Sequence, residues 1–178
     1  MTPDDIHFRV PAVADAEAIA RLHVASWREA YSAIVPASVL DAVDVADRIA
    51  RWQGYLASEG VTFLAEAGGG AAGFIRAGVP DKPMVADADG HIFALYVLQR
   101  HHRRGIGRRL LALTAAEWLR RGGRALSVGV LTENRPALAF YRGAGASFAQ
   151  ADTYRWDGHD LPESIYVFRN LPDLARFA

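Results

Sequence analysis

The chain has 178 residues, of which 51% are hydrophobic and 22% are charged, so it can bury a core as one compact domain. Its 20 basic and 20 acidic residues cancel at pH 7, which removes the overall positive field that nucleic acids or an acidic membrane would attract. The absence of cysteine excludes disulfides, cysteine metal sites and a cysteine nucleophile.

The sequence indicates neither an N-terminal secretory signal nor a membrane span. Residues 1–9 lack the apolar stretch of a secretory signal, and no apolar run approaches the ~20 residues that a membrane span needs. We therefore expect a cytoplasmic protein with a single domain over residues 1–178, and no membrane or nucleic-acid partner.

The N-terminal third predicts one short strand and two helical regions. The strand is expected at Phe8–Val10, and the first helix runs from Ala14 to Ala25 and on to about Tyr31, with Asp15 as its cap. The second helical region begins at Pro36. The inner face of this region is formed by apolar residues at helical spacing, namely Leu40, Val43, Ile49, Trp52 and Leu56.

The middle of the chain predicts three strands. Val61–Glu66 and Ala72–Val79 flank Gly68–Gly70, whose glycines suit a hairpin turn. After a polar connection over residues 80–90, Ile92–Leu98 is apolar on both faces, which is typical of a central strand covered on both sides.

A basic, glycine-containing loop, His102–Gly107, lies between this apolar strand and an amphipathic helix predicted at Arg108–Arg121. The first N–H groups of a helix have no partner inside the helix and lie at the positive end of its dipole. Gly105 and Gly107 allow the backbone to come close to an anion because they have no Cβ. The loop therefore predicts a site for a phosphorylated cofactor.

Two common phosphate loops do not fit. A Walker A loop needs G-x-x-x-x-G-K-[ST], and the only lysine, Lys82, lies far from this loop. A dinucleotide fingerprint needs G-x-G-x-x-G, and Leu110 stands where the third glycine should be.

The C-terminal part predicts a strand, a helix and two more strands. Apolar residues alternate over Ala125–Leu131, and Pro136 suits the first turn of a helix that starts near Asn134. The closing strands are expected at Phe148–Trp156 and Ser164–Arg169, with a turn at Asp157–Gly158.

Two of these segments together resemble the GCN5-related N-acetyltransferase (GNAT) superfamily. The loop H-R-R-G-I-G is similar to the family's [QR]-x-x-G-x-[GA], with His102 as the departure. The later helix matches N-x-x-A-x-x-F-Y-x-x-x-G at Asn134, Ala137, Phe140, Tyr141 and Gly145. The resemblance spans about residues 8–171. It implies an α/β (α+β) fold with a mixed central sheet of about six to seven strands and about four helices, in the order β-α-α-β-β-β-α-β-α-β-β.

The resemblance implies an N-acetyltransferase that moves the acetyl group of acetyl-CoA to a primary amine by direct attack in a ternary complex. The acceptor is expected to be a small-molecule or peptide amine, and polyamines, amino acids, antibiotics, peptide N-termini and protein lysines all stay open. The alternative is a non-catalytic acyl-CoA-binding sensor or interaction module on the same fold. A homodimer is also possible. No metal site is expected, because the adjacent His101 and His102 point apart and lack a third ligand.

The resemblance also assigns roles around the cofactor. Tyr141 takes the place of the general acid that protonates the departing sulfur. Main-chain amides of Leu95, Tyr96 and Val97 are expected to bind the pantetheine arm and to polarise the thioester carbonyl, with Asn134 as a further contact. The pyrophosphate is assigned to the loop residues His102, Arg103, Arg104, Gly105, Ile106, Gly107 and Arg108.

The sequence indicates the general base and the acceptor pocket less directly than it indicates the cofactor site. His91 stands where the family often has a glutamate, and histidine can accept a proton near neutral pH. Asp89, Glu29 or a water chain are the alternatives. The segment His23–Tyr31 resembles H-x-x-S-W-x-x-x-Y of small-molecule acetyltransferases. Its Trp27 and Tyr31 share one helix face, where they can either line the acceptor site or pack in the core.

Overall fold

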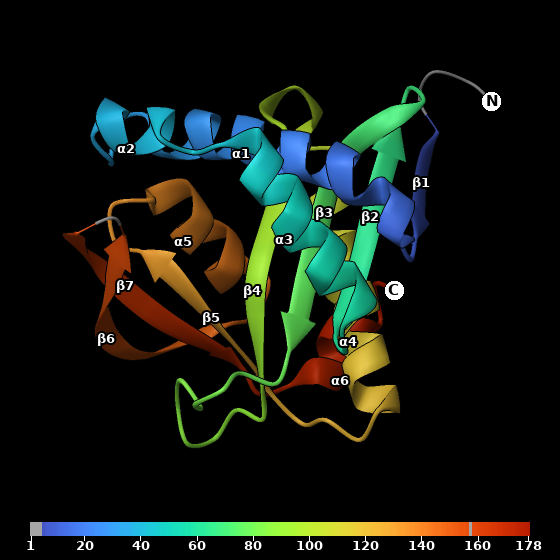
Figure 1. The fold of residues 1–178 in the computed structure, drawn as a ribbon. Helices are drawn as coiled ribbons and strands as arrows, with labels where there is room; N and C mark the ends of the chain where they lie inside the picture. The colour runs from blue at the N-terminus through green and yellow to red at the C-terminus, as the bar shows by residue number, and fades with distance from the viewer. Residues whose placement is uncertain (1–4, 157) are drawn as a thin grey trace.

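The computed structural model describes residues 5–156 and 158–178. Seven strands form one mixed sheet in the order β1-β2-β3-β4-β5-β7-β6, with helices on both faces (Figure 1). This confirms the predicted fold class. The described residues contain six α-helices rather than about four, because a short α2 and a short C-terminal α6 were not expected.

The N-terminal segment contains β1 (Ile6–Arg9), α1 (Ala16–Tyr31), α2 (Ala37–Asp41) and α3 (Val45–Ala57). The single helical region expected after Pro36 is thus divided, because Asp44 caps α3 by accepting a hydrogen bond from the amide of Ala46 at 2.7 Å. The cap expected at Asp15 is not made. Its carboxylate instead pairs with Arg9 at 2.7 Å and accepts the amide of Ala12, so it ties β1 to α1.

The other elements follow the predicted order. They are β2 (Val61–Ala67), β3 (Gly70–Gly78), β4 (Gly90–Val97), α4 (Ile106–Arg120), β5 (Leu126–Leu131), α5 (Arg135–Gly143), β6 (Ser147–Trp156), β7 (His159–Phe168) and α6 (Leu171–Ala175).

The last strand is longer than its sequence indicates. β7 starts at His159 rather than Ser164, because it pairs with β6 from Trp156↔His159 onward. Its first half is polar and contains Pro162, so it lacks the apolar alternation that marks a strand. Of the expected turn, Asp157 lies outside the described residues, and Gly158 has a φ of 78°.

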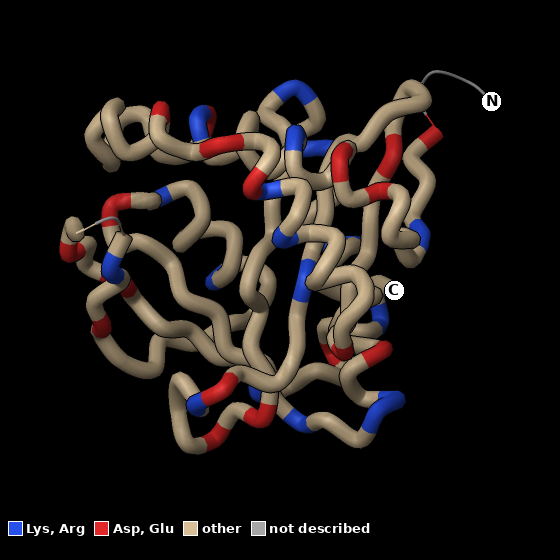
Figure 2. Tube along the Cα trace, in the orientation of Figure 1, with Lys and Arg blue, Asp and Glu red and all other residues tan. Residues whose placement is uncertain are grey.

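The core lies on both faces of the sheet. On one face, α1 and α3 cover the sheet (Figure 1). They bury Ile19 and Trp52 against Phe74. On the other face, α4, α5 and α6 contribute Leu110, Leu138 and Leu171, among others, to the largest apolar cluster. A third cluster joins α2 to the end of β5 and to the β6–β7 hairpin. Acidic and basic positions are interspersed along the chain (Figure 2).

The two central strands diverge. β4 and β5 are parallel, but they pair only over Gly90–Ile92 and Leu126–Val128. Beyond this point β4 continues to pair with β3 as far as Val97, while β5 continues beside β7. A bulge places Phe93 between the residues that pair with β3 and leaves it 50% exposed, so β4 is not covered on both sides along its whole length as expected. The amides of β4 that face β5 beyond Ile92 therefore lack a strand partner.

Within the described part of the chain, no helix is both long and apolar enough to cross a membrane.

Candidate active site

The basic loop forms the predicted N-terminus of α4. The turn Gln99–His101 leads into the loop, and both Arg103 (φ 60°) and Gly105 (φ 79°) adopt the left-handed conformation. The first helical hydrogen bond runs from the amide of Arg109 to the carbonyl of Gly105 at 3.0 Å. The amides of Ile106, Gly107 and Arg108 come before it, so no carbonyl inside the helix can accept from them. Amides of this kind can bind an anion, and the pyrophosphate site assigned to them stays a prediction.

The two glycines of the loop serve different purposes. Gly105 needs its left-handed backbone, and a Cβ there would have no neighbour within 4 Å. At Gly107 a Cβ would lie 3.1 Å from the ring of Phe140, so this glycine allows α4 to approach α5 closely. The second motif is thus packed directly against the first.

The side chains of the loop mostly bind the protein itself. The imidazole of His102 donates from Nε2 to the carbonyl of Val97 at 2.8 Å, which ties the loop to the end of β4. The guanidinium of Arg108 stacks over the ring of Phe177 at 4.1 Å from its centroid. Arg104 lies beside His101, with 3.3 Å between Nη1 and Nδ1. The cofactor contacts assigned to these residues stay predictions, and main-chain amides are the groups of this loop best placed to make them.

Tyr141 and Asn134 lie on α5, on the face of the sheet that α4 also covers. Tyr141 is buried against Phe168 and Phe140. Burial, and secondly the nearby Tyr31, raise the pKa of the Tyr141 phenol well above its usual value, so this phenol keeps its proton. The side-chain oxygen of Asn134 accepts the amide of Ala137 at 3.2 Å, so Asn134 is the N-cap of α5. The contact of Asn134 with pantetheine stays a prediction.

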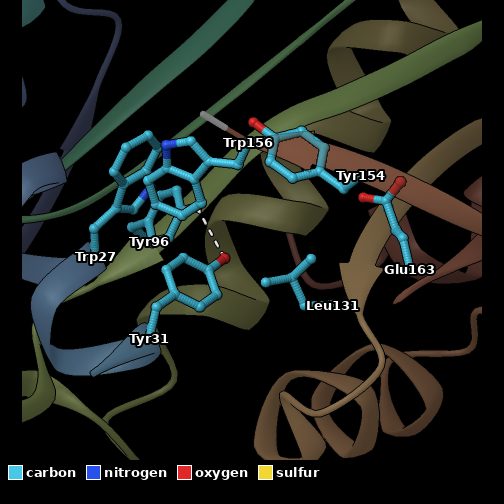
Figure 3. Close-up of a pocket in the computed structure, with 8 residues that line it drawn as sticks. Trp27, Tyr31, Tyr96, Leu131, Tyr154, Trp156 and Glu163 are labelled. Carbon is cyan, nitrogen blue, oxygen red and sulfur yellow. Dashed lines mark hydrogen bonds between the residues drawn. The ribbon is translucent and has the colours of Figure 1, made fainter. Parts of the chain in front are cut away.

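A second cluster of groups forms a small cavity of about 90 Å³ on the opposite face (Figure 3). Trp27 and Tyr31 both line it, and their role in binding the acceptor stays a prediction. The ring of Trp156 contacts that of Trp27 in a tilted arrangement, with 4.5 Å between the ring centroids, and the hydroxyls of Tyr31 and Tyr96 lie 3.2 Å apart. Gly129 and Leu131 complete the wall on β5. Because Tyr96 lies on β4, the cavity borders the place where β4 and β5 diverge.

His23 supports this cavity from behind. It is buried, accepts a hydrogen bond from Trp52 Nε1 at 3.2 Å, and contacts the rings of Trp27 and Tyr96. Burial, and secondly the charge of Arg48, lower the pKa of His23 to about 3, so it stays neutral and acts as an aromatic support.

His91, the expected base, lies at the closed end of the β4–β5 divergence, paired with Ser127. The Ser127 hydroxyl donates to the carbonyl of Gly90 at 3.0 Å, so it accepts the Nδ1 proton of His91 across 2.9 Å. Burial lowers the pKa of His91 to about 4, which is below the value near 6.5 that the sequence suggests. His91 is not among the residues that line the cavity. Its role as base stays a prediction.

The two alternative bases both hold the backbone. Glu29 Oε2 accepts the amide of Gln99 at 2.8 Å and so fixes the turn before the loop. Asp89 accepts hydrogen bonds from Trp118 Nε1 at 3.0 Å and from the amides of Arg124 and Ala125. Burial of Asp89 opposes its ionisation, but these donors outweigh it and lower its pKa to about 2.

Replacing Asp89 by alanine is therefore expected to lower the free energy of unfolding at pH 7 by about 2 kcal/mol, because buried donors lose their partner. A carboxylate with a lowered pKa stabilises the fold above its unfolded pKa near 3.9, and the effect is lost as the pH falls through about 2. Urea unfolding measures the difference. Asp87→Ala is the control, since Asp87 is exposed and pairs only with Arg169 among the described residues. Equal effects of the two variants would contradict the prediction.

Glu163 was missed by the sequence analysis, although it lines the same cavity as Trp27 and Tyr31 (Figure 3). It lies on β7 opposite Leu131 of β5, in the half of the strand that was not predicted. A Cβ on Gly129 would lie 2.3 Å from its Oε1, so the carboxylate occupies the space that a side chain there would fill. A glycine inside a strand marks such a close approach, and Gly129 was the signal available in the sequence.

Within residues 5–156 and 158–178, no group of three or more His, Asp or Glu side chains lies close enough together to hold a metal ion.

Solved structures with this fold include coenzyme A complexes. PaiA N-acetyltransferase of Thermoplasma acidophilum, in complex with coenzyme A, has a TM-score of 0.69 and 20% identity, covering 90% of this chain and 98% of that one. The yncA protein of Salmonella typhimurium, with acetyl-CoA, has a TM-score of 0.70 and 18% identity, covering 93% and 94%. These likenesses establish the fold.

The family follows from sequence. The model of the acetyltransferase (GNAT) family matches residues 17–146. The Bacillus subtilis (strain 168) protein named as an uncharacterized N-acetyltransferase, YuaI, is 30% identical over 161 residues, which cover 90% of each chain. The two motifs, the diverging strands and both sequence matches agree, and the chain belongs to the GNAT family of acetyltransferases.

Proposed function

We propose that this protein is an acetyl-CoA-dependent N-acetyltransferase that acts on a primary amine by direct attack in a ternary complex. The observation that carries the proposal is the divergence of β4 and β5 beside the N-terminus of α4, with Tyr141 buried next to it. The proposal is supported because free amides at a helix N-terminus, free strand amides and a protonated phenol lie close together.

The residues present fit acetyl-CoA. The amides of Ile106, Gly107 and Arg108 would receive the pyrophosphate, since they lack helical partners. The β5-facing amides of Leu95–Val97 would pair with the pantetheine arm as with an added strand. When bound, acetyl-CoA supplies an acyl group activated as a thioester.

Tyr141 would act as the proton donor. Its raised pKa keeps the phenol protonated, and no residue that the structure describes makes a hydrogen bond to its hydroxyl. As the amine nitrogen forms its bond to the acyl carbon, the carbon–sulfur bond breaks and its electron pair stays on sulfur. Tyr141 then gives its proton to that sulfur, which avoids a free thiolate. His91 is the proton acceptor that the family resemblance assigns.

Calorimetry with acetyl-CoA, followed by an assay of coenzyme A release in the presence of pooled primary amines, tests the proposal. We expect binding and amine-dependent release. Absence of binding by the folded protein would overturn it. Binding without release for any amine would instead support the non-catalytic acyl-CoA-binding module.

The acceptor is taken to be a small-molecule or peptide amine. Size-exclusion chromatography with light scattering distinguishes a monomer from a homodimer.

A further inference from the structure

The cavity on the α1 face has the composition of a cation site. Five aromatic residues line it, and Glu163 is the only charged one among its described lining residues. The aromatic residues are Trp27, Tyr31, Tyr96, Tyr154 and Trp156. Aromatic faces attract ammonium groups through the ring quadrupole, and this attraction grows as water is removed.

Glu163 points into this cavity without a partner of its own (Figure 3). It makes no hydrogen bond or ion pair with any residue that the structure describes. Asp152 is its cross-strand neighbour on β6, and the repulsion between the two carboxylates adds to the effect of burial. Together burial and Asp152 raise the pKa of Glu163 to about 7.

The tyrosines around Glu163 are neutral, and Arg48, the basic residue near them, does not line the cavity. Tyr31 of α1 and Tyr154 of β6 have raised pKa values, each mainly because of burial, and Tyr96 of β4 likewise keeps its proton. Arg48 of α3 stacks on Trp27 at 4.5 Å from the ring centroid and is not among the lining residues. A carboxylate with no cation beside it leaves room for the positive charge of a ligand.

The size of the cavity limits this ligand. Its volume of about 90 Å³ is well below the ~300 Å³ at which pockets for drug-sized molecules begin. A space this small admits the ammonium group and the first carbons of a chain. A branch on the carbon that carries the nitrogen would widen the group that must enter, so an unbranched chain fits best. An amine that carries a carboxylate on the reacting carbon would bring that charge next to Glu163, and no cationic side chain among the lining residues would offset it.

We propose that Glu163 binds the ammonium group of the acceptor inside this aromatic cavity and accepts its proton, and that the acceptor is a terminal amine on an unbranched carbon chain. The assignment rests on the proposed function. The cavity borders the divergence of β4 and β5 through Tyr96 and Gly129, so a bound amine would face the thioester held between these strands.

One ammonium proton moves to the Glu163 carboxylate and on to solvent, which leaves the neutral nucleophile. The nitrogen loses a second proton when the amide forms. That second proton balances the one that sulfur receives, so the overall reaction releases one proton.

The test uses three amines of four carbons each with the full-length protein: n-butylamine, sec-butylamine and 2-aminobutanoate. We expect kcat/KM for n-butylamine to exceed that for each of the other two by at least about 10-fold. Preference for 2-aminobutanoate or sec-butylamine would overturn the assignment of the acceptor.

The Glu163→Gln variant tests the carboxylate. We expect kcat/KM for n-butylamine at pH 8 to fall by at least about 10-fold, because the base is lost, while the acetyl-CoA Kd stays within about 2-fold. In the wild type, the acidic limb of the rate profile should lie near pH 7 and disappear in the variant. Asp152→Asn should move this limb to lower pH, because it removes the repulsion that raises the Glu163 pKa. A limb near pH 7 retained in Glu163→Gln would exclude Glu163.

Asp160→Asn is the matched control, because Asp160 lies on the same strand but pairs with Arg155 at the surface. It should leave kcat/KM and the pH profile unchanged. His91→Ala separates the two candidate bases, since a limb that depends on His91 should lie near pH 4. Failure of the protein to bind acetyl-CoA overturns the proposed function. Transfer of acetyl groups with unaltered kinetics in Glu163→Gln overturns only the present inference.

Discussion

Tyr141→Phe is expected to lower kcat by about 100-fold and to leave the Kd of acetyl-CoA almost unchanged. General acid catalysis contributes about 100-fold or more, and phenylalanine keeps the buried ring while it removes the proton. The pKa of Tyr141 is raised chiefly by burial, so the phenol is protonated over the whole working pH range and loss of the hydroxyl should lower kcat at every pH. Steady-state kinetics with a saturating amine, together with calorimetry, measures both quantities.

Tyr166→Phe serves as the control for Tyr141→Phe. Tyr166 is also buried, but its hydroxyl accepts a hydrogen bond from Arg142 at 2.8 Å and belongs to the packing of α5 on β7. It should alter Tm more than kcat. If chemistry is rate-limiting and Tyr141→Phe keeps the wild-type kcat, Tyr141 has only a packing role.

Gly105→Val is expected to raise the Kd of acetyl-CoA by about 10- to 100-fold. A β-branched residue is strongly disfavoured at the φ of 79° found there, so the loop must change its conformation. The amides of Ile106, Gly107 and Arg108 then no longer point toward the pyrophosphate. Because one hydrogen bond to a charged group contributes about 1.5–3 kcal/mol, the loss of one or more of them weakens binding by this amount or more. Calorimetry at fixed ionic strength measures the loss.

Gly122→Val is the control for Gly105→Val. Gly122 has a φ of 86° and a Cβ there would also have open space, but it lies just after the other end of α4. Both variants should lower Tm through backbone strain, and only Gly105→Val should weaken binding. Similar affinities for acetyl-CoA in both variants would show that the pyrophosphate is not held by this loop.

Most of the fold could be predicted from the sequence because its elements carry strong local patterns. α4 and α5 begin at capping residues and motifs, and β2 to β5 are apolar enough to be recognised. The first half of β7 was missed because it is polar, contains Pro162 and is held as a strand by pairing with β6 rather than by its own propensity. The division between α2 and α3 depends on one capping contact at Asp44.

The candidate site likewise contains residues that the sequence could indicate and residues that it could not. The loop Arg103–Arg108 and Tyr141 lie within continuous motifs, so their residues could be identified before the structure was known. The candidate acceptor cavity is instead lined by residues from α1, β4, β5, β6 and β7, several of which are distant in sequence. Glu163 has no motif around it, and its raised pKa comes from burial and from Asp152, which only the pairing of β6 with β7 brings close.

The position of β7 also governs when the site can form during synthesis. Because β7 lies between β5 and β6, β5 leaves the ribosome with only its short parallel contact to β4 and with its other edge open. That edge is closed by the ten residues of β7, which are made after β5, α5 and β6. Since Glu163 comes from β7, a nascent chain cannot assemble the candidate acceptor cavity before β7 has left the ribosome, and activity should appear only after that point.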